Sequence, residues 1–101
     1  GAEINLQNSN GSTALTYAAV QGNERVVDLL LQRGADINLQ NSNDSTALML
    51  AADNGHERVV ELLLQRGAEI NLQNSNDQTA LMGAASRGHP ATVLLLLRVG
   101  A

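Results

Sequence analysis

The stretch TALMLAADNGHERVVELLLQRGA, residues 46–68, decides the fold of this 101-residue chain. Thr46 is a good N-cap for the short helix-forming run that follows it, and Gly55 can take the positive φ that ends a helix. A second, longer helix with a broad apolar face follows from Glu57 to Arg66, with its acidic end at the positive pole of the helix dipole. Neither helix can bury its apolar face alone, so this unit must pack against others like it.

The unit occurs three times, with a period of 33 residues. A Gly-Ala pair recurs at the same point of each period, at Gly1, Gly34, Gly67 and Gly100. Residues 1–33 and 34–66 differ at only 8 positions, and residues 34–66 and 67–99 differ at 11. Identity at this level excludes chance, so the chain consists of copies of one supersecondary unit.

These repeats resemble the ankyrin repeat, a family marked by a 33-residue period. The resemblance rests on the run at residues 46–52, on Gly55-His56, on the leucines 62–64 and on residues 67–71, and it covers essentially the whole chain. Two departures recur. The Pro that usually follows the Thr in this family is replaced by Ala14, Ala47 and Ala80. The His that usually comes after the following Leu is replaced by Thr16, Met49 and Met82. The hydrogen bond that this His normally makes is therefore absent.

The resemblance implies an all-α fold class, namely an ankyrin-repeat solenoid of helix-turn-helix units joined by β-hairpin loops. We predict a single ankyrin repeat domain over residues 1–101, with the helices of the repeats at about 13–33, 46–66 and 79–99. Residues 1–12 are expected to be the remnant of a preceding repeat's hairpin.

The composition excludes several classes of function. The chain has no Cys, which rules out disulfides and thiolate metal sites. Its formal net charge is −4 and its basic residues are scattered, whereas binding to nucleic acid or an anionic membrane needs clustered cations. The apolar runs are too short to span a bilayer. We therefore expect no nucleic-acid, membrane, metal or cofactor binding. Because no signal peptide opens the chain, we expect a cytoplasmic or nuclear location.

The residue pattern does not predict an enzyme. The only histidines, His56 and His89, hold the same position in successive repeats, each after a Gly at the start of a second helix. A hydrogen bond that supports the turn is the role we expect for them. No Asp/Glu cluster completes a metal site, no base is placed beside a Ser or Thr, and the glycines form no phosphate-binding loop.

The differences between repeats partly cluster, and this indicates where a partner would bind. Positions three and four apart share a helix face, so Tyr17, Val20 and Gln21 lie together, as do their equivalents in the other repeats. The resemblance to ankyrin repeats implies protein or peptide binding through the hairpin tips and the concave inner-helix face. The candidate partner-binding residues are Ser9, Asn10, Ser12, Tyr17, Val20, Gln21, Ser42, Asn43, Ser45, Leu50, Asp53, Asn54, Asn76, Gln78, Ser86 and Arg87.

Some alternatives stay open at this point. Tyr17 is the best candidate for an interface anchor, because aromatic side chains dominate interface energetics, but it could instead pack between repeats. Arg87 could be a solvated charge. Asp44 and Asp77 replace Gly11 at the turns, where we expect mild strain.

The third repeat has lost most of the charged flank of its second helix. Leu94 replaces Glu61 and Val99 replaces Arg66, which leaves an apolar end that also includes Leu97. Either further repeats of a longer parent cover this end, or another copy or a partner does. The function we expect is therefore a non-catalytic protein-protein interaction module. The alternative is an engineered ankyrin array, made for folding, assembly or binder scaffolding, with no natural partner.

Overall fold

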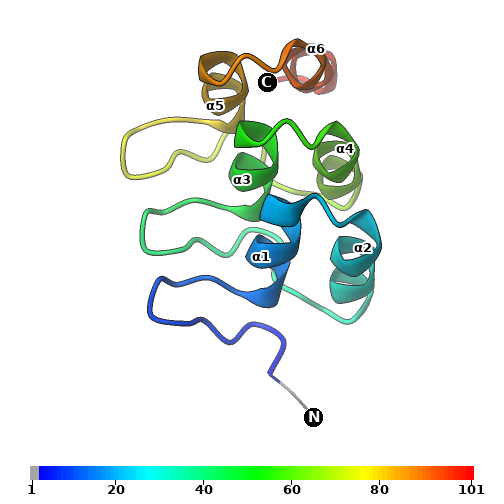
Figure 1. The fold of residues 1–101 in the computed structure, drawn as a ribbon, viewed down its shortest axis with the longest axis vertical. Coiled ribbons are helices and arrows are strands. Elements are labelled where there is room, and N and C mark those ends of the chain that lie inside the picture. Colours follow the sequence, from blue (N-terminus) through cyan, green and yellow to red (C-terminus); the bar gives the residue numbers. More distant parts are fainter. Residues whose placement is uncertain (1–2) are drawn as a thin grey trace.

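The computed structural model describes residues 3–101 and contains six helices in that range. They form three antiparallel pairs, one in each repeat. The helices are α1 (Ala14–Gln21), α2 (Glu24–Gln32), α3 (Ala47–Asp53), α4 (Glu57–Gln65), α5 (Ala80–Ser86) and α6 (Pro90–Val99). The pairs stack into an elongated body of 39 × 26 × 20 Å (Figure 1). Gly1 and Ala2, where we expected the hairpin remnant to begin, lie outside the described residues.

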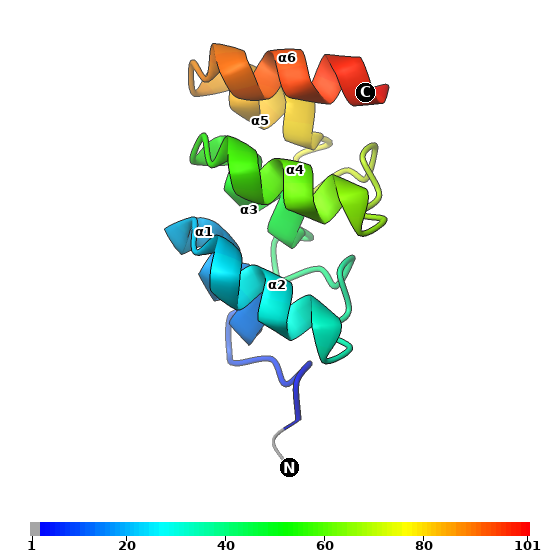
Figure 2. The ribbon, with the colours of Figure 1, turned by 90° about the vertical axis from the view of Figure 1, so that its right-hand side faces the viewer.

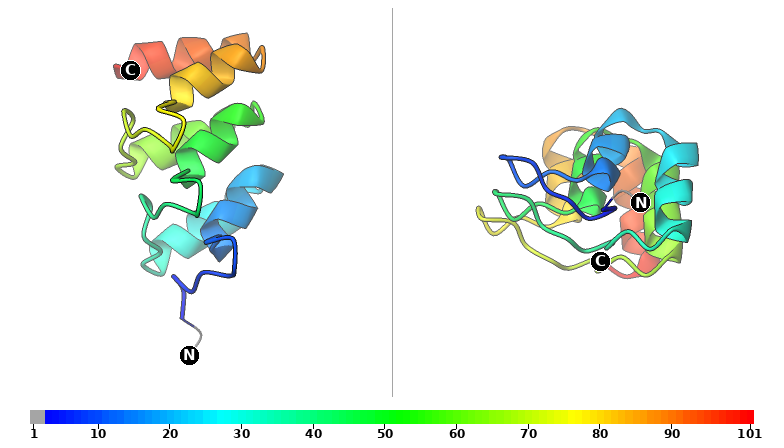
Figure 3. Two further views of the ribbon diagram at one scale, coloured as in Figure 1. Left: turned by 90° about the vertical axis from the view of Figure 1, so that its left-hand side faces the viewer. Right: turned by 90° about the horizontal axis from the view of Figure 1, so that it is seen from below.

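The stack has an inner and an outer row of helices. α1, α3 and α5 form the inner row beside the long connecting loops, and α2, α4 and α6 form the outer row on the opposite side (Figure 1). Figure 2 shows the outer row stacked one helix above another, and both views in Figure 3 show the loops extending together from the inner row. Each repeat therefore contributes one loop tip and one short helix to the same side of the molecule.

Short polar caps explain why each inner helix begins where it does. The hydroxyls of Thr13, Thr46 and Thr79 accept hydrogen bonds from the backbone N–H three residues on. In the first repeat Thr16 makes the reciprocal bond of a capping box, because its hydroxyl accepts a hydrogen bond from the Thr13 N–H at 2.8 Å. Met49 cannot do so and is buried instead. The departure from the family pattern is thus compensated by a hydrogen bond in the first repeat and by apolar packing in the second.

The core is built from small and aliphatic side chains, as the absence of Phe and Trp requires. Alanines lie between the inner helices, where Ala19, Ala51 and Ala52 are fully buried and let the helices approach closely. Leucine and valine side chains fill the space between the inner and outer rows. The largest fully buried apolar residues are Leu15, Val27, Leu48, Val59, Val60, Leu63 and Leu96.

The connecting loops differ from our expectation, because residues 3–101 contain no β-strand and so no β-hairpin pairing. In the second loop the N–H of Asn41 donates to the Ser45 carbonyl at 2.9 Å, and the N–H of Asp44 donates back to the Asn41 carbonyl. The side-chain oxygen of Asn41 then accepts from the N–H groups of Asn43 and Ser45. Because a side-chain amide accepts these bonds, the loop closes as a compact turn and forms no strand ladder.

Hydrogen bonds between repeats hold the loops in register. The Ser42 N–H donates to the Asn10 carbonyl at 3.0 Å, and the Ser75 N–H donates to the Asn43 carbonyl at 3.0 Å. The Gln7 side chain donates across its own loop to Gly11 and onward to the Gln40 carbonyl of the next repeat. Gln40 repeats both contacts one repeat later. The loops therefore form one continuous layer, which presents its tips in a row.

Candidate partner-binding surface

The candidate residues lie at the loop tips and on the side of α1, α3 and α5 that is next to the loops, and most of them are exposed. Ser12, Val20, Leu50 and Asp53 are half-buried. Ser45 is 9 % exposed, because its loop lies between the loops of the first and third repeats, so we leave it out of the candidate surface. We call the remaining set the loop-side face. It consists of Ser9, Asn10, Ser12, Tyr17, Val20, Gln21, Ser42, Asn43, Leu50, Asp53, Asn54, Asn76, Gln78, Ser86 and Arg87.

The loop tips present one exposed amide side chain in each repeat. Asn10, Asn43 and Asn76 are exposed, and none of their side chains makes a hydrogen bond within residues 3–101. Their backbone N–H groups, in contrast, are held by the asparagine two residues earlier in each loop. Each tip thus combines a fixed backbone with a free amide, which can both donate and accept hydrogen bonds.

Tyr17 is the one Phe, Trp or Tyr residue of the sequence, and its side chain is not buried between the repeats. Its exposed fraction is 53 %. Its hydroxyl accepts a hydrogen bond from Asn8 Nδ2 at 2.7 Å, so the ring is tied to the base of the first loop. An exposed ring in a restricted position loses little conformational entropy when a partner covers it. The structure therefore leaves Tyr17 available as an anchor.

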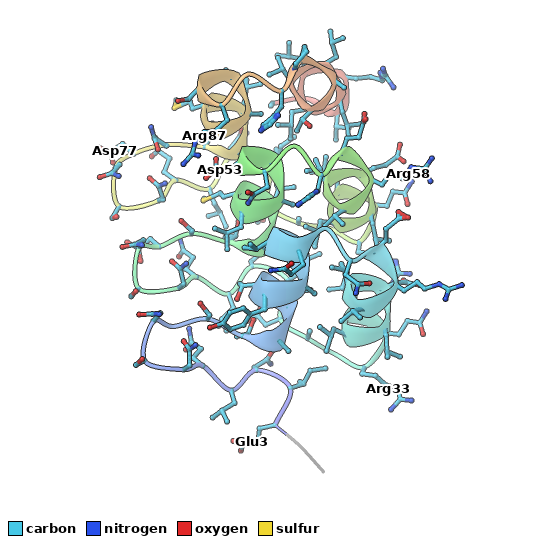
Figure 4. All side chains as sticks on the ribbon, in the orientation of Figure 1. Glu3, Arg33, Asp53, Arg58, Asp77 and Arg87 are labelled. Atoms are coloured by element: carbon cyan, nitrogen blue, oxygen red, sulfur yellow. The ribbon has the colours of Figure 1, made fainter. Side chains whose placement is uncertain are left out.

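Asp53 and Arg87 form a charged pair beside Gly83, between the second and third repeats. Figure 4 shows the side chains of Asp53 and Arg87 close together on the loop side of α3 and α5. Partial burial raises the pKa of Asp53, and the positive charges of Arg87 and His89 oppose this shift. A Cβ atom on Gly83 would lie 1.9 Å from Asp53 Oδ1, so the missing side chain at position 83 makes room for the carboxylate. The leucine-to-glycine change between repeats thus shapes this surface.

Two candidates also have a structural role that the sequence did not indicate. The carbonyl oxygens of Val20 and Asp53 accept hydrogen bonds from His56 Nε2 and His89 Nε2, each at 2.8 Å. The histidines support turns as expected, but the turn that each one supports belongs to the preceding repeat. The variable side chains at positions 20 and 53 are therefore carried on a fixed backbone.

Other polar residues organise this surface, and differences between repeats do not point to them because they are the same in every repeat. Asn8, Asn41 and Asn74 close the three loops, and Gln7 and Gln40 link them. All five positions are identical in every repeat, and that identity was the available signal. Their contacts are internal, so they position the loop-side face and do not add to it.

The outer row offers a different kind of surface. A groove of about 530 Å³ between α2 and α4 is lined by charged side chains, among them Glu24, Arg25 and Arg58. Arg58 points away from the loops (Figure 4). Across residues 3–101 no group of three or more His, Cys, Asp or Glu residues could hold a metal ion. In the same part of the chain, no helix is long and apolar enough to cross a membrane.

The fold and this surface define a helical-repeat solenoid with an exposed row of loops. The sequence matches the family of ankyrin repeats in three copies, over residues 1–74 and 37–101, and the chain belongs to this family. Ankyrin repeats are in general protein-protein interaction modules without catalytic activity. No curated protein matches the chain.

Proposed function

We propose that this protein is a non-catalytic module that binds a protein or peptide through the loop-side face. The observation that carries the proposal is the row of free amides at Asn10, Asn43 and Asn76, one at each tip of the hydrogen-bonded loop layer. Amide side chains at repeated spacing suit the backbone of an extended segment, which offers donors and acceptors at regular intervals.

The side chains behind the tips would give such a partner its orientation. Tyr17 offers an aromatic anchor at the N-terminal end, and Arg87 offers a positive charge at the C-terminal end. A segment with an apolar group at one end and an acidic group at the other therefore fits this face best. The polar residues between them contribute register more than affinity.

We propose a cytoplasmic or nuclear location for this activity, without nucleic acid or membrane lipid as the ligand. The net charge of −4 gives no electrostatic attraction to phosphate-rich surfaces. The exposed carboxylates of Asp44 and Asp77 at the loop tips would also repel a polyanion.

Selection from a random peptide library on the immobilised chain tests the proposal. The bound peptides should share an apolar residue and an acidic residue at a fixed separation. Their footprint in hydrogen exchange should fall on the loops, α1, α3 and α5. A triple variant at Tyr17, Asp53 and Arg87 should lose binding, whereas Arg58→Ala on the outer row should keep it. A footprint on α2, α4 and α6 would contradict the proposal.

The second candidate is an engineered array made for folding, assembly or binder scaffolding, with no natural partner. The near-identity of the repeats favours it, because residues 1–33 and 34–66 differ at only 8 positions. Searching genomes for tandem copies of the loop sequence from Asn38 to Asn43 separates the two candidates. Natural tandem copies would exclude the engineered array.

A further inference from the structure

Backbone hydrogen bonds set a regular spacing along the row of loop tips. Within the second loop, the Asn41 N–H donates to the Ser45 carbonyl at 2.9 Å and so joins the two sides of the loop. Between loops, the Ser42 N–H donates to the Asn10 carbonyl at 3.0 Å. Both bonds recur one repeat later. Each repeat therefore adds two hydrogen-bonded backbone segments to the loop layer.

These bonds fix the distance from one tip to the next. Backbone segments joined in this way lie about 4.8 Å apart, so two of them place equivalent tips about 9.6 Å apart. The inner helices agree with this spacing, because α1 packs on α3 and α3 on α5, and packed helices are about 8–10 Å apart. The three tips follow one another along the stack (Figure 1). The exposed amides of Asn10, Asn43 and Asn76 therefore form a row with this period.

Among regular peptide conformations, polyproline II has the matching period. One turn has three residues and a length of about 9.3 Å, so residues i, i+3 and i+6 face the same side at this spacing. A β-strand does not match, since residues on one face recur about every 6.7 Å and residue i+3 lies on the opposite face. An α-helix repeats its face about every 10.5 Å, but its backbone groups are already paired and cannot bond to the amides.

We propose that the partner of the loop-side face is a proline-rich segment in the polyproline II conformation, which presents every third residue to one loop tip. This inference rests on the function proposed above and specifies the chemical class of the partner. The carbonyl groups of such a segment are free, because the conformation has no internal hydrogen bonds. The amides of Asn10, Asn43 and Asn76 would donate to the carbonyls of residues i, i+3 and i+6. This contact needs no N–H from the partner, so it accepts proline at every position.

Tyr17 favours the same partner. Its ring is 53 % exposed, and the hydrogen bond from Asn8 holds its hydroxyl at the base of the first loop. Proline-rich segments dock against aromatic side chains, and their conformation is largely formed before binding. Both partners would therefore lose little conformational entropy in this contact.

The two ends of the loop-side face then fix the length of the segment. Tyr17 belongs to the first repeat and Arg87 to the third, so two tip-to-tip steps separate their repeats. Two turns of polyproline II cover this distance with six residues. An apolar residue opposite Tyr17 and an acidic residue opposite Arg87 should thus be six positions apart in the partner.

A series of synthetic peptides tests this spacing. Each peptide carries one leucine and one glutamate, separated by four, five or six prolines, and each is made in both orders. In calorimetric titration the peptide with five prolines should bind about tenfold or more tightly than the other two in the favoured order. One residue more or fewer turns the glutamate by about 120° away from Arg87. Equal affinity of the three lengths would overturn the proposal.

The random-library peptides described above separate a failure of this inference from a failure of the proposed function. If library peptides bind the loop-side face but none of the proline series binds, the polyproline II partner is wrong and the proposed function stands. If neither set binds, both are wrong. Binding of the proline series with a hydrogen-exchange footprint on α2, α4 and α6 would also overturn both.

The middle tip separates a polyproline II segment from a β-strand. A strand along the row could match Asn10 and Asn76 with residues i and i+6, but its residue i+3 faces away from Asn43. Asn43→Ala and Asn10→Ala should therefore each weaken the best proline peptide by about three- to tenfold, through loss of one hydrogen bond. Unchanged affinity of Asn43→Ala beside a loss in Asn10→Ala would overturn the proposal.

Two controls accompany these variants. Neither asparagine side chain makes a hydrogen bond within residues 3–101, so thermal unfolding of both variants should match that of the unmodified protein. Arg58→Ala on the outer row should keep the affinity of the unmodified protein, because its side chain points away from the loops (Figure 4). An equal loss of affinity in that variant would mean unspecific binding and would overturn the proposal.

Discussion

The imidazole of His56 in the second repeat donates from Nε2 to the carbonyl oxygen of Val20 in the first repeat, at 2.8 Å. The ring lies against Gly22, where a Cβ atom would be 2.6 Å from His56 Nδ1. The same arrangement joins His89 to Asp53 and Gly55 one repeat later. One histidine in each junction thus fixes both the spacing of the repeats and the type of residue at the preceding turn.

Substitution at this junction should show strong coupling. His56→Ala removes a hydrogen bond and leaves the Val20 carbonyl without its partner, which should lower the free energy of unfolding by about 1–3 kcal/mol. Gly22→Ala places a methyl group against the ring, at a residue whose φ is +72°. It should lower the free energy of unfolding by more than the cost of placing alanine at a positive φ. The double variant should cost less than the sum of the two single variants, because removing the ring also removes the clash.

Gly34→Ala is the matched control for the clash. Gly34 also has positive φ, at +93°, but nothing lies within 4 Å of the Cβ atom that the substitution adds. Urea denaturation of the four variants gives the coupling energy. Additive costs at Gly22 and His56 would show that the ring does not set the spacing of the repeats.

Asp53→Asn should change how stability depends on pH. Burial raises the pKa of Asp53 in the folded protein, so the folded state holds a proton more tightly than the unfolded state. The free energy of unfolding of the unmodified protein should therefore fall as the pH rises from the ordinary value of 3.8 through the raised value. The asparagine side chain does not ionise, so the variant should keep this stability and unfold at a higher temperature than the unmodified protein at pH 7. The difference between the two unfolding temperatures should vanish in acid, where Asp53 is protonated.

Thermal unfolding at closely spaced pH values measures this effect. A variant that unfolds at a lower temperature than the unmodified protein at pH 7 would mean that attraction to Arg87 and His89 outweighs burial, since a lowered pKa would make the charged carboxylate stabilising. Arg87→Ala removes one opposing charge and should make the pH dependence steeper.

Asp44 tests the strain that we expected at the loop tips. Its φ is 59° and that of Asp77 is 62°, which places both in the left-handed region that Gly11 occupies at 73°. Asp44→Ala should lower the free energy of unfolding by about 1 kcal/mol, because alanine lacks the short polar side chain that tolerates this region. Asp44→Gly should raise it by a few tenths of a kcal/mol, roughly, since relief of strain exceeds the added chain entropy. Equal stability of the two variants in urea denaturation would contradict this view.

Tyr17→Ala should separate binding from folding. The side chain is 53 % exposed and has one hydrogen bond, to Asn8 at 2.7 Å, so its loss should cost about 1 kcal/mol of stability or less. Affinity for peptides selected on the unmodified protein should fall about tenfold or more, as expected for an aromatic anchor. Calorimetric titration and thermal unfolding measure the two effects. Lower stability with unchanged affinity would show that Tyr17 serves the fold alone.

Tertiary structure decided how the repeats meet. Ser45 and Ser12 are equivalent in sequence, yet only Ser45 is buried, because only its loop has a neighbour on both sides. Similarly, His56 could be recognised as a residue that supports a turn, but its acceptor in the preceding repeat could not. Contacts of this kind join residues 31 to 38 positions apart. They depend on the offset between stacked repeats, which no pattern within one repeat contains.

The sequence by itself determined the 33-residue unit, its two helices, and the need of each unit for a neighbour. These features follow from helix caps, glycines and the spacing of apolar residues. Such signals act over a few residues and can therefore be recognised in the sequence. Only the stacked structure decided which side chains are exposed beside the loops and which are buried between repeats. Burial depends on what lies alongside a repeat, so repeats of near-identical sequence differ in exposure according to their place in the stack.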